Sequence, residues 1–177
     1  QEVLIVTLVN SAVDNFAARI RQLIRTDYHL LPGMGYRVRT LHSLALDLVR
    51  ERPGLVGLAE DFAVADEGEC SRLLNDAVQS NLRAHAGLFD VYAKTDYANS
   101  ALARRHWQED RAATVAKAFI RQAKDRQWTP DFLRSCYAGR TEPLPLAQFC
   151  LDVYADYQRG LGYRGKVDFD DLVSNAY

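Results

Sequence analysis

The first fifty residues show two kinds of hydrophobic pattern. Residues 3–9 (VLIVTLV) form a continuous apolar run, which is typical of a strand buried on both faces of a parallel sheet. Residues 10–25 then carry apolar side chains at helical spacing. After a break rich in proline and glycine, a short alternating strand leads into a second helix near His42 and Ser43. This β-α-β-α order predicts a parallel α/β layer.

From about Asp66 the β-branched runs disappear and long amphipathic stretches replace them. Their helical periodicity predicts a helical middle part, followed by a last short helix that starts at Asp168. The middle helices are expected at 67–85, 100–128, 129–139 and 144–163, and the second of them is expected to bury Val115, Ala116, Phe119, Ile120 and Ala123. The sequence therefore predicts a mainly α protein with a small parallel α/β part.

The opening strand needs neighbours on both sides of it in a sheet. Only one other good strand candidate is present, beginning at Tyr36. We therefore expect strands from outside residues 1–177 to complete the sheet.

Length and composition limit the class of protein. A chain of 177 residues fits one medium domain, and its net charge of −1 with a pI near 6.5 does not by itself indicate nucleic acid. No run approaches the roughly 18 apolar residues that cross a bilayer, so we expect a soluble, cytoplasmic protein without a membrane partner. Cys70, Cys136 and Cys150 are far apart and lack CxxC spacing, which argues against a disulfide framework and a zinc site.

Polar residues follow both predicted strands of the N-terminal part. Unpaired N–H groups at a helix start, together with the helix dipole, can bind a phosphate, and polar side chains there add further donors. The alternative is plain helix capping, for which Asn10 or Ser11 is well placed. The candidates are Thr7, Asn10 and Ser11 at the first turn and Arg39, Thr40, His42 and Ser43 at the second. Turns on adjacent parallel strands would share one sheet edge, which favours a common ligand.

Three carboxylates gather near the C-terminal end, in the stretch VDFDDLV. As metal ligands, Asp168, Asp170 and Asp171 would need a convergent geometry that DFDD at a helix start does not obviously supply. Asp168 as an N-cap, with acidic residues in the first turn, is the simpler interpretation.

A basic stripe and several aromatic residues are candidates for a second nucleic-acid surface. Lys117, Arg121 and Lys124 follow helical spacing opposite the apolar face, where they form either a solvated face or a weak nucleic-acid contact. The aromatic residues, which either stack on bases or belong to the core, are Trp107, Trp128, Tyr92 and Tyr97.

Taken in order, these segments resemble the N-terminal half of UvrD/Rep/PcrA-type superfamily 1 DNA helicases. The family pattern TFTNKAAxEM is matched by residues 7–16 (TLVNSAVDNF), and TFHS is matched by residues 40–43 (TLHS) with an amphipathic helix behind it. The family's helical subdomain ends in a segment like YxxYQxxLxxxxxxDFDDLL, and residues 154–173 read YADYQRGLGYRGKVDFDDLV. The resemblance covers essentially the whole chain, and the three motifs are more specific together than alone.

The resemblance implies an ATP-dependent DNA helicase or translocase as the parent protein, with a role such as DNA repair and 3′-to-5′ travel. It divides the chain into a partial RecA-like motor domain (1–65), a 1B-like helical subdomain (66–165) and a helix returning to the motor domain (166–177). The implied partners are single-stranded DNA or DNA junctions and the rest of the helicase chain.

The resemblance also implies ATP and Mg²⁺ as cofactors of the parent protein. Their GxxGxGKT and DExQD motifs are expected before Gln1 and after Tyr177. We therefore expect no catalytic residue, no metal ligand and no tightly bound cofactor in this chain, which by itself should not hydrolyse ATP.

This sequence departs from the family pattern in the turns. The family's aromatic residues are Leu8 and Leu41 here, and the lysine of TFTNK is Ser11. Leucine gives only part of the contact that an aromatic ring makes with a base. Two alternatives stay open: a non-catalytic helical module that binds DNA or protein, and part of a RecB/AddA-like helicase–nuclease subunit.

Overall fold

The computed structural model describes residues 3–27, 35–90, 101–140 and 144–177. The chain forms two compact units, one from Gln1–Glu60 with Asn175–Tyr177 and one from Asp61–Ser174. Most of the described residues are helical, and the strands form two small parallel sheets. The predicted fold class, mainly α with a small parallel α/β part, is confirmed.

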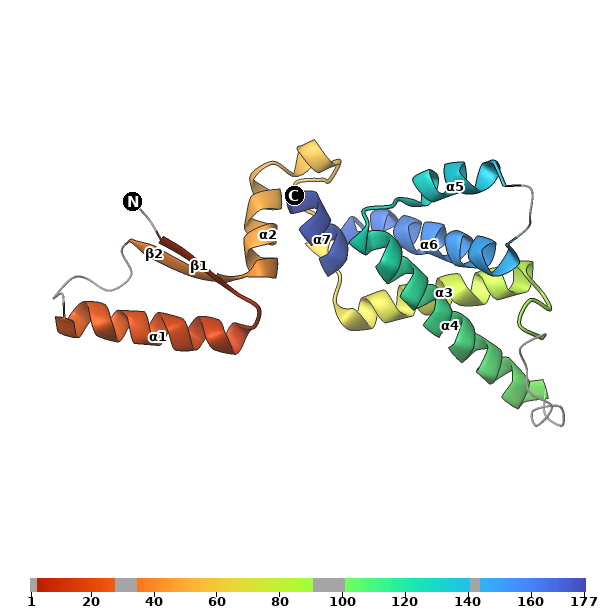
Figure 1. Cartoon of the computed structure of the whole chain (residues 1–177), viewed down its shortest axis with the longest axis horizontal. Helices are drawn as coiled ribbons and strands as arrows, with labels where there is room; N and C mark the ends of the chain where they lie inside the picture. The colour runs from red at the N-terminus through yellow and green to blue at the C-terminus, as the bar shows by residue number, and fades with distance from the viewer. Residues whose placement is uncertain (1–2, 28–34, 91–100, 141–143) are drawn as a thin grey trace. The chain divides into compact units, whose positions relative to one another are not determined.

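The first unit alternates strands and helices, as the hydrophobic pattern predicts. Its elements are β1 (Val3–Thr7), α1 (Asn10–Asp27), β2 (Tyr36–Thr40), α2 (Leu41–Glu51) and the short 3-10 helix η1 (Pro53–Val56). The two strands pair in parallel, and α1 runs alongside them (Figure 1). Val38 of β2 is buried, as are Ala45 and Val49 of α2.

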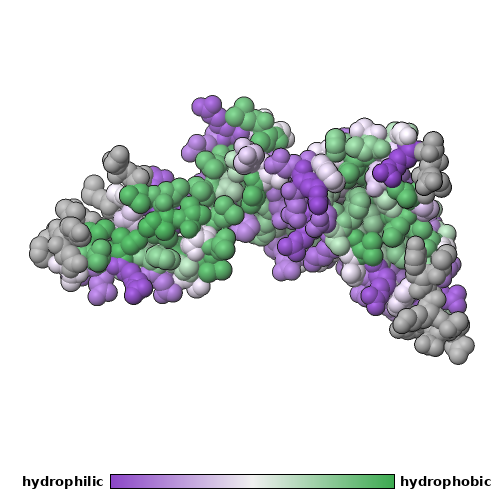
Figure 2. Space-filling model, viewed as in Figure 1, coloured by the Kyte–Doolittle hydropathy of each residue, from purple (hydrophilic) through white to green (hydrophobic). Residues whose placement is uncertain are grey.

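The opening strand is not buried on both faces within this chain, contrary to the expectation from its apolar run. Val3, Leu4 and Val6 are 58%, 48% and 45% exposed. The reason is that, within the described residues, β1 pairs with β2 alone, so few side chains are available to cover it. Figure 2 shows the resulting hydrophobic surface over this unit. The exposure agrees with the expectation of further strands, which stays a prediction.

The second unit is a helical bundle built around α6. Its helices are α3 (Glu67–Ala84), α4 (Ala101–Asp125), α5 (Pro130–Ala138), α6 (Pro145–Tyr163) and α7 (Phe169–Ala176), whose last residues group with the first unit. α3, α4 and α5 all pack against α6, in which Phe149, Leu151 and Val153 are fully buried. No described helix combines the length and the apolar character that crossing a membrane requires.

The predicted core face of the long fourth helix is confirmed. Ala116, Ile120 and Ala123 are buried, and Val115 and Phe119 pack partly buried against the same core. Their spacing of three and four residues places them on one side of the helix, which is the pattern that predicted them.

A second parallel ladder closes the helical unit. The two-residue strands β3 (Ala63–Val64) and β4 (Lys166–Val167) pair, and the Ala65 N–H donates to the Val167 carbonyl at 2.8 Å. Lys166 also forms an ion pair with Glu69, in the first turn of α3. The chain therefore enters and leaves the bundle at the same end, which the hydrophobic pattern did not predict because the strands are so short.

The glycines near the end of α6 do not all end the helix. α6 passes through Gly160 and Gly162 and ends at Tyr163, and Gly165 then adopts a positive φ of 63°. A Cβ atom at Gly160 would lie 3.1 Å from the Leu73 side chain. Gly160 therefore permits close packing of α6 on α3 instead of marking a turn.

The described cysteines are free thiols in three different environments. Burial raises the pKa of Cys150 to about 11, and burial also raises the pKa of Cys70. Cys136 is exposed on α5. The two thiols with raised pKa values stay protonated at neutral pH and are therefore poor nucleophiles.

Candidate nucleic-acid interface

The parallel pairing of β1 and β2 brings the two polar turns together. Thr7, the last residue of β1, lies opposite Thr40, the last residue of β2. α1 begins at Asn10 and α2 begins at Leu41, so both helix starts follow the same edge of the sheet. The expectation that the turns lie on adjacent parallel strands is confirmed.

The first turn leaves its polar side chains on the surface. The Val9 carbonyl accepts hydrogen bonds from the N–H groups of Ala12 and Val13 at 3.1 and 3.4 Å, so Val9 occupies the capping position. The cap therefore lies one residue before Asn10 and two before Ser11, the two positions expected for it. Both of these residues lie in its first turn and are exposed.

The second turn uses its hydroxyl groups to start the helix. The Ser43 N–H donates to Thr40 Oγ1 at 3.1 Å, and the Thr40 N–H donates to Ser43 Oγ at 2.9 Å. This reciprocal pair is a capping box, and Thr40 is only 8% exposed. Thr40 and Ser43 therefore shape the turn, and their hydroxyl groups already have partners.

Arg39 and His42 lie on the outer side of the same turn. The Arg39 guanidinium donates to Asp47 Oδ2 at 3.1 Å, in an ion pair with about half of each side chain exposed. His42 is exposed in the first turn of α2. Within the described residues, neither α1 nor α2 carries an acidic side chain in its first turn, which leaves both helix dipoles favourable to an anion.

Apolar side chains lie beside these polar groups. Leu8 and Val9 follow β1 and are 80% and 55% exposed, and Leu41, which follows β2, is 41% exposed. The edge therefore offers hydrogen-bond donors and aliphatic surface together.

Two of the three carboxylates near the C-terminal end contact a buried lysine, whereas Asp170 is exposed. Asp168 caps α7, as predicted, because its Oδ1 accepts from the Asp171 N–H at 2.9 Å. Lys124 Nζ lies 2.5 Å from Asp168 Oδ2 and 2.8 Å from Asp171 Oδ1. The Tyr157 hydroxyl donates to Asp168 and the Gln158 amide donates to Asp171, at 2.8 and 3.0 Å. These residues form a buried ionic network that joins α4, α6 and α7.

The two carboxylates of this network have pKa values shifted in opposite directions. Burial raises the pKa of Asp168, but the charge of Lys124 and the surrounding hydrogen bonds outweigh burial and lower it. Burial raises the pKa of Asp171, and the neighbouring negative charge of Asp168 raises it further. Burial lowers the pKa of Lys124, but its two carboxylate partners more than offset this and raise it. Lys124 and Asp168 therefore carry the more stable charges.

The predicted basic stripe is wrong at one of its three positions. Lys117 and Arg121 are exposed on α4, whereas Lys124 is 5% exposed and belongs to the network. Lys124 follows Ile120 by four residues, so it continues the buried face of the helix. That spacing was the signal available in the sequence.

The aromatic candidates also differ in their exposure. Trp107 packs against the core, whereas Trp128 is 41% exposed. Tyr92 and Tyr97 lie outside the described residues.

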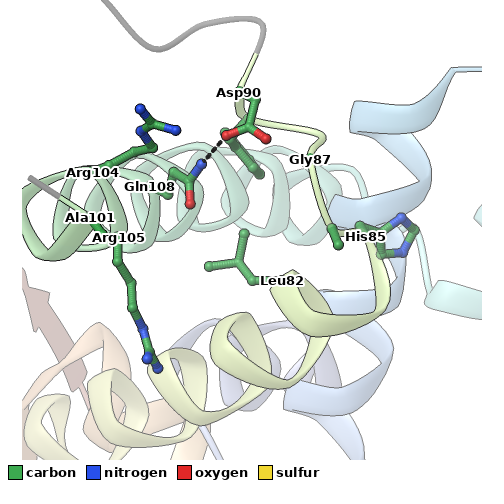
Figure 3. A pocket seen from close by; sticks show the side chains of 10 residues that line it. Leu82, His85, Gly87, Asp90, Ala101, Arg104, Arg105 and Gln108 are labelled. Carbon is green, nitrogen blue, oxygen red and sulfur yellow. Dashed lines mark hydrogen bonds between the residues drawn. The ribbon is translucent and has the colours of Figure 1, made fainter. Parts of the chain in front are cut away.

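A cavity of about 370 Å³ lies between the end of α3, the turn after it and the start of α4 (Figure 3). The amide of Gln108 donates to Asp90 at 2.7 Å, and Arg105 is paired with Glu109. The Arg104 and Arg105 side chains point in different directions in Figure 3. These polar groups do not converge on one point, so the cavity lacks the arrangement that a ligand site requires.

The fold combines a parallel strand–helix layer, with polar turns at one sheet edge, and a helical unit, which is compatible with a fragment of a helicase motor domain. The family model of the UvrD/REP helicase N-terminal domain matches residues 1–177, so the chain belongs to this family. A search of curated proteins gave no match.

Helicases of this family generally use ATP and Mg²⁺. The sequence contains no GKT or GKS phosphate loop, and Asp168 and Asp171 are both paired with the single ammonium group of Lys124. Among the described residues, no three His, Cys, Asp or Glu side chains are arranged to hold a metal ion.

The buried lysine gives the first prediction. We expect Lys124→Met to lower the free energy of unfolding by about 3–5 kcal/mol, because it leaves two carboxylates buried without a counter-charge. Urea unfolding followed by circular dichroism measures the loss. Arg121→Met, on the exposed face of the same helix, is the control and should change stability by less than about 0.5 kcal/mol. Equal losses in the two variants would contradict a structural role of the ion pair.

The unequal pKa values of the two carboxylates give the second prediction. The lowered pKa of Asp168 stabilises the fold above its unfolded pKa, and this stability is lost as the pH falls through the folded value. The raised pKa of Asp171 has the opposite sign, since the charged form costs stability at neutral pH and protonation removes the cost. At pH 7, Asp168→Asn should therefore destabilise the protein clearly more than Asp171→Asn.

Urea unfolding between pH 7 and pH 3 tests this order. The difference between the two variants should narrow as the wild-type carboxylates become protonated. If Asp171→Asn proves the more damaging substitution at pH 7, the assignment of the stable charge to Asp168 is wrong.

Proposed function

We propose that this chain supplies single-stranded DNA contacts within an ATP-dependent DNA helicase or translocase. Family membership supports the helicase class. The observation that carries the DNA contact is the register of β1 and β2, which sets the turns at Asn10 and Leu41 side by side. The phosphate loop and the catalytic carboxylates belong to other parts of the parent protein.

The residues of the two turns have different roles in holding a DNA strand. Asn10, Ser11 and His42 offer exposed side chains for phosphate oxygens, next to helix starts that favour negative charge. Thr40 and Ser43 hold the second turn in shape through their capping box. Leu8 and Leu41 provide aliphatic surface against which bases can rest.

Translocation in this scheme needs a track that keeps its shape while the DNA moves. Opening and closing between two motor domains during the ATP cycle shifts the strand, and these turns hold its phosphates between shifts. Backbone contacts suit this task because they are the same at every nucleotide.

The third prediction concerns these donors. Asn10→Ala and His42→Ala in the full-length protein should each weaken single-stranded DNA binding by about 1–2 kcal/mol, or roughly 5- to 30-fold in Kd, because each removes a hydrogen bond to a charged oxygen. Fluorescence anisotropy at moderate salt measures Kd, and DNA-stimulated ATPase activity should fall in parallel.

Two matched controls accompany these variants. Asn15→Ala removes an exposed asparagine further along α1, and His106→Ala removes an exposed histidine on α4. Both should bind DNA like the wild type. If both Asn10→Ala and His42→Ala bind single-stranded DNA with wild-type affinity, the turns only start the helices and have no role in DNA binding.

The fourth prediction concerns the leucines. Leu8→Phe and Leu41→Phe should strengthen single-stranded DNA binding, by up to about 1 kcal/mol each, because a ring stacks on a base where an aliphatic chain only touches it. Leu55→Phe is the control, since Leu55 is 78% exposed in η1, away from the strand ends. If all three variants bind alike, bases do not contact the turn leucines.

A further inference from the structure

The connection between α4 and α5 holds Trp128 in a fixed position on the surface. Gln127 has a positive φ of 56°, and its N–H donates to the Lys124 carbonyl. The Trp128 N–H donates to the Ala123 carbonyl at 2.9 Å, which completes a Schellman motif with glutamine where glycine is usual. The Tyr154 hydroxyl donates to the Trp128 carbonyl at 3.3 Å. Both the N–H and the carbonyl of Trp128 are therefore hydrogen-bonded, while the residue is 41% exposed.

Trp128 belongs to a row of flat groups. Its ring centroid lies 6.2 Å from that of Phe132, with the planes 35° apart. The Arg126 guanidinium lies over the indole, 5.4 Å from its centroid. Phe132 is 48% exposed. We call Arg126, Trp128 and Phe132 the aromatic row.

The two rings of the aromatic row lie outside the core cluster of the bundle. α5 contacts the core through Leu133, which is 7% exposed, and through the partly buried Tyr137, and the other tryptophan of the chain, Trp107, also packs against the core. Burying a large aromatic side chain stabilises a fold by about 1.5–3 kcal/mol. Two such rings held on the surface, one by a strained backbone position, indicate a surface that a partner covers.

The charge around the row favours a polyanionic partner. Arg126 lies at the row itself, and the segment from Lys117 to Arg140 carries five exposed cationic side chains and two exposed carboxylates, of which Asp131 is paired with Arg134, although the whole chain has a net charge of −1. Exposed rings next to arginines are the combination that binds unpaired bases and phosphates together.

We propose that the aromatic row is a second contact for single-stranded nucleic acid, located on the helical unit and separate from the strand-end turns. The substrate class rests on the proposed function, but the residues are different. Bases stack on the exposed rings, and the neighbouring cations attract the phosphates.

Binding of a labelled oligo-dT to the full-length protein tests the proposal. Trp128→Ala and Phe132→Ala should each raise Kd by about 5-fold or more, whereas Trp128→Phe keeps a ring and should stay within about 2-fold of the wild type. Tyr163→Ala is the matched control, because Tyr163 is 94% exposed at the end of α6 in the same unit and should not affect binding. Thermal melts confirm that each variant is folded.

Duplex DNA of the same length separates stacking from general charge attraction. Trp128→Ala should change duplex binding by less than about 2-fold, because paired bases do not offer their faces. Equal single-strand affinity of Trp128→Ala and Tyr163→Ala would overturn the proposal, and so would equal losses on single-stranded and duplex DNA.

The strand-end variants distinguish this proposal from the proposed function. Wild-type DNA binding by Asn10→Ala and His42→Ala together with weak binding by Trp128→Ala would support the aromatic row as a DNA contact. The same result would contradict the proposed role of the turns. The reverse result retains the turns and overturns the aromatic row.

Discussion

Parallel strand pairing is the constraint on which the arrangement of both units depends. Two parallel strands cannot be joined by a tight turn, so the chain must cross back along the sheet before the second strand begins. In the first unit α1 lies within this crossover, and as a result Thr7 and Thr40 end at the same edge. An antiparallel pair would have sent the two turns to opposite ends of the sheet.

The second unit uses the same constraint over a longer distance. In the described residues, helices α3 to α6 lie between β3 and β4 along the chain, so the short ladder joins the start and the end of the bundle. α7 follows directly, and among its residues Leu172 is the buried one. A short helix with so little buried apolar surface depends on its polar contacts, and Asp168 and Asp171 supply them through Lys124. A buried ion pair contributes less to net stability than to the choice of one arrangement, because its desolvation cost offsets much of its attraction.

Much of this architecture was predictable from the sequence because it depends on local periodicity. The apolar spacing of α4 predicted its buried face, and Asp168 ahead of Phe169 predicted the cap of α7. The ladder of Ala63 and Val64 was not predictable, since two residues have no periodicity. The basic stripe predicts an exposed Lys124, because a lysine is rarely buried, although its spacing from Ile120 places it on the apolar face.

In the candidate site, too, features that depend on neighbouring residues were predictable, whereas features that depend on contacts between distant residues were not. The motifs around Asn10 and His42 predicted two polar turns, and the parallel order predicted that they are adjacent. The sequence did not show that Thr40 and Ser43 would bond to each other, because a hydroxyl near a helix start suits a cap and a ligand equally well. Nor did it separate Trp107 from Trp128, whose exposures depend on contacts between helices.

The two proposed contacts differ in what they recognise. A turn that offers N–H groups and polar side chains binds phosphate oxygens, which single strands and duplexes both present. Stacking on Trp128 and Phe132 needs an open base face, which only unpaired nucleotides present. Phosphate contacts alone would hold both forms of DNA, and the aliphatic surface of Leu8 and Leu41 gives unpaired bases only part of the contact that a ring makes. Stacking on the aromatic row adds a preference for single-stranded DNA. Because every base has a flat face, this preference does not depend on the DNA sequence.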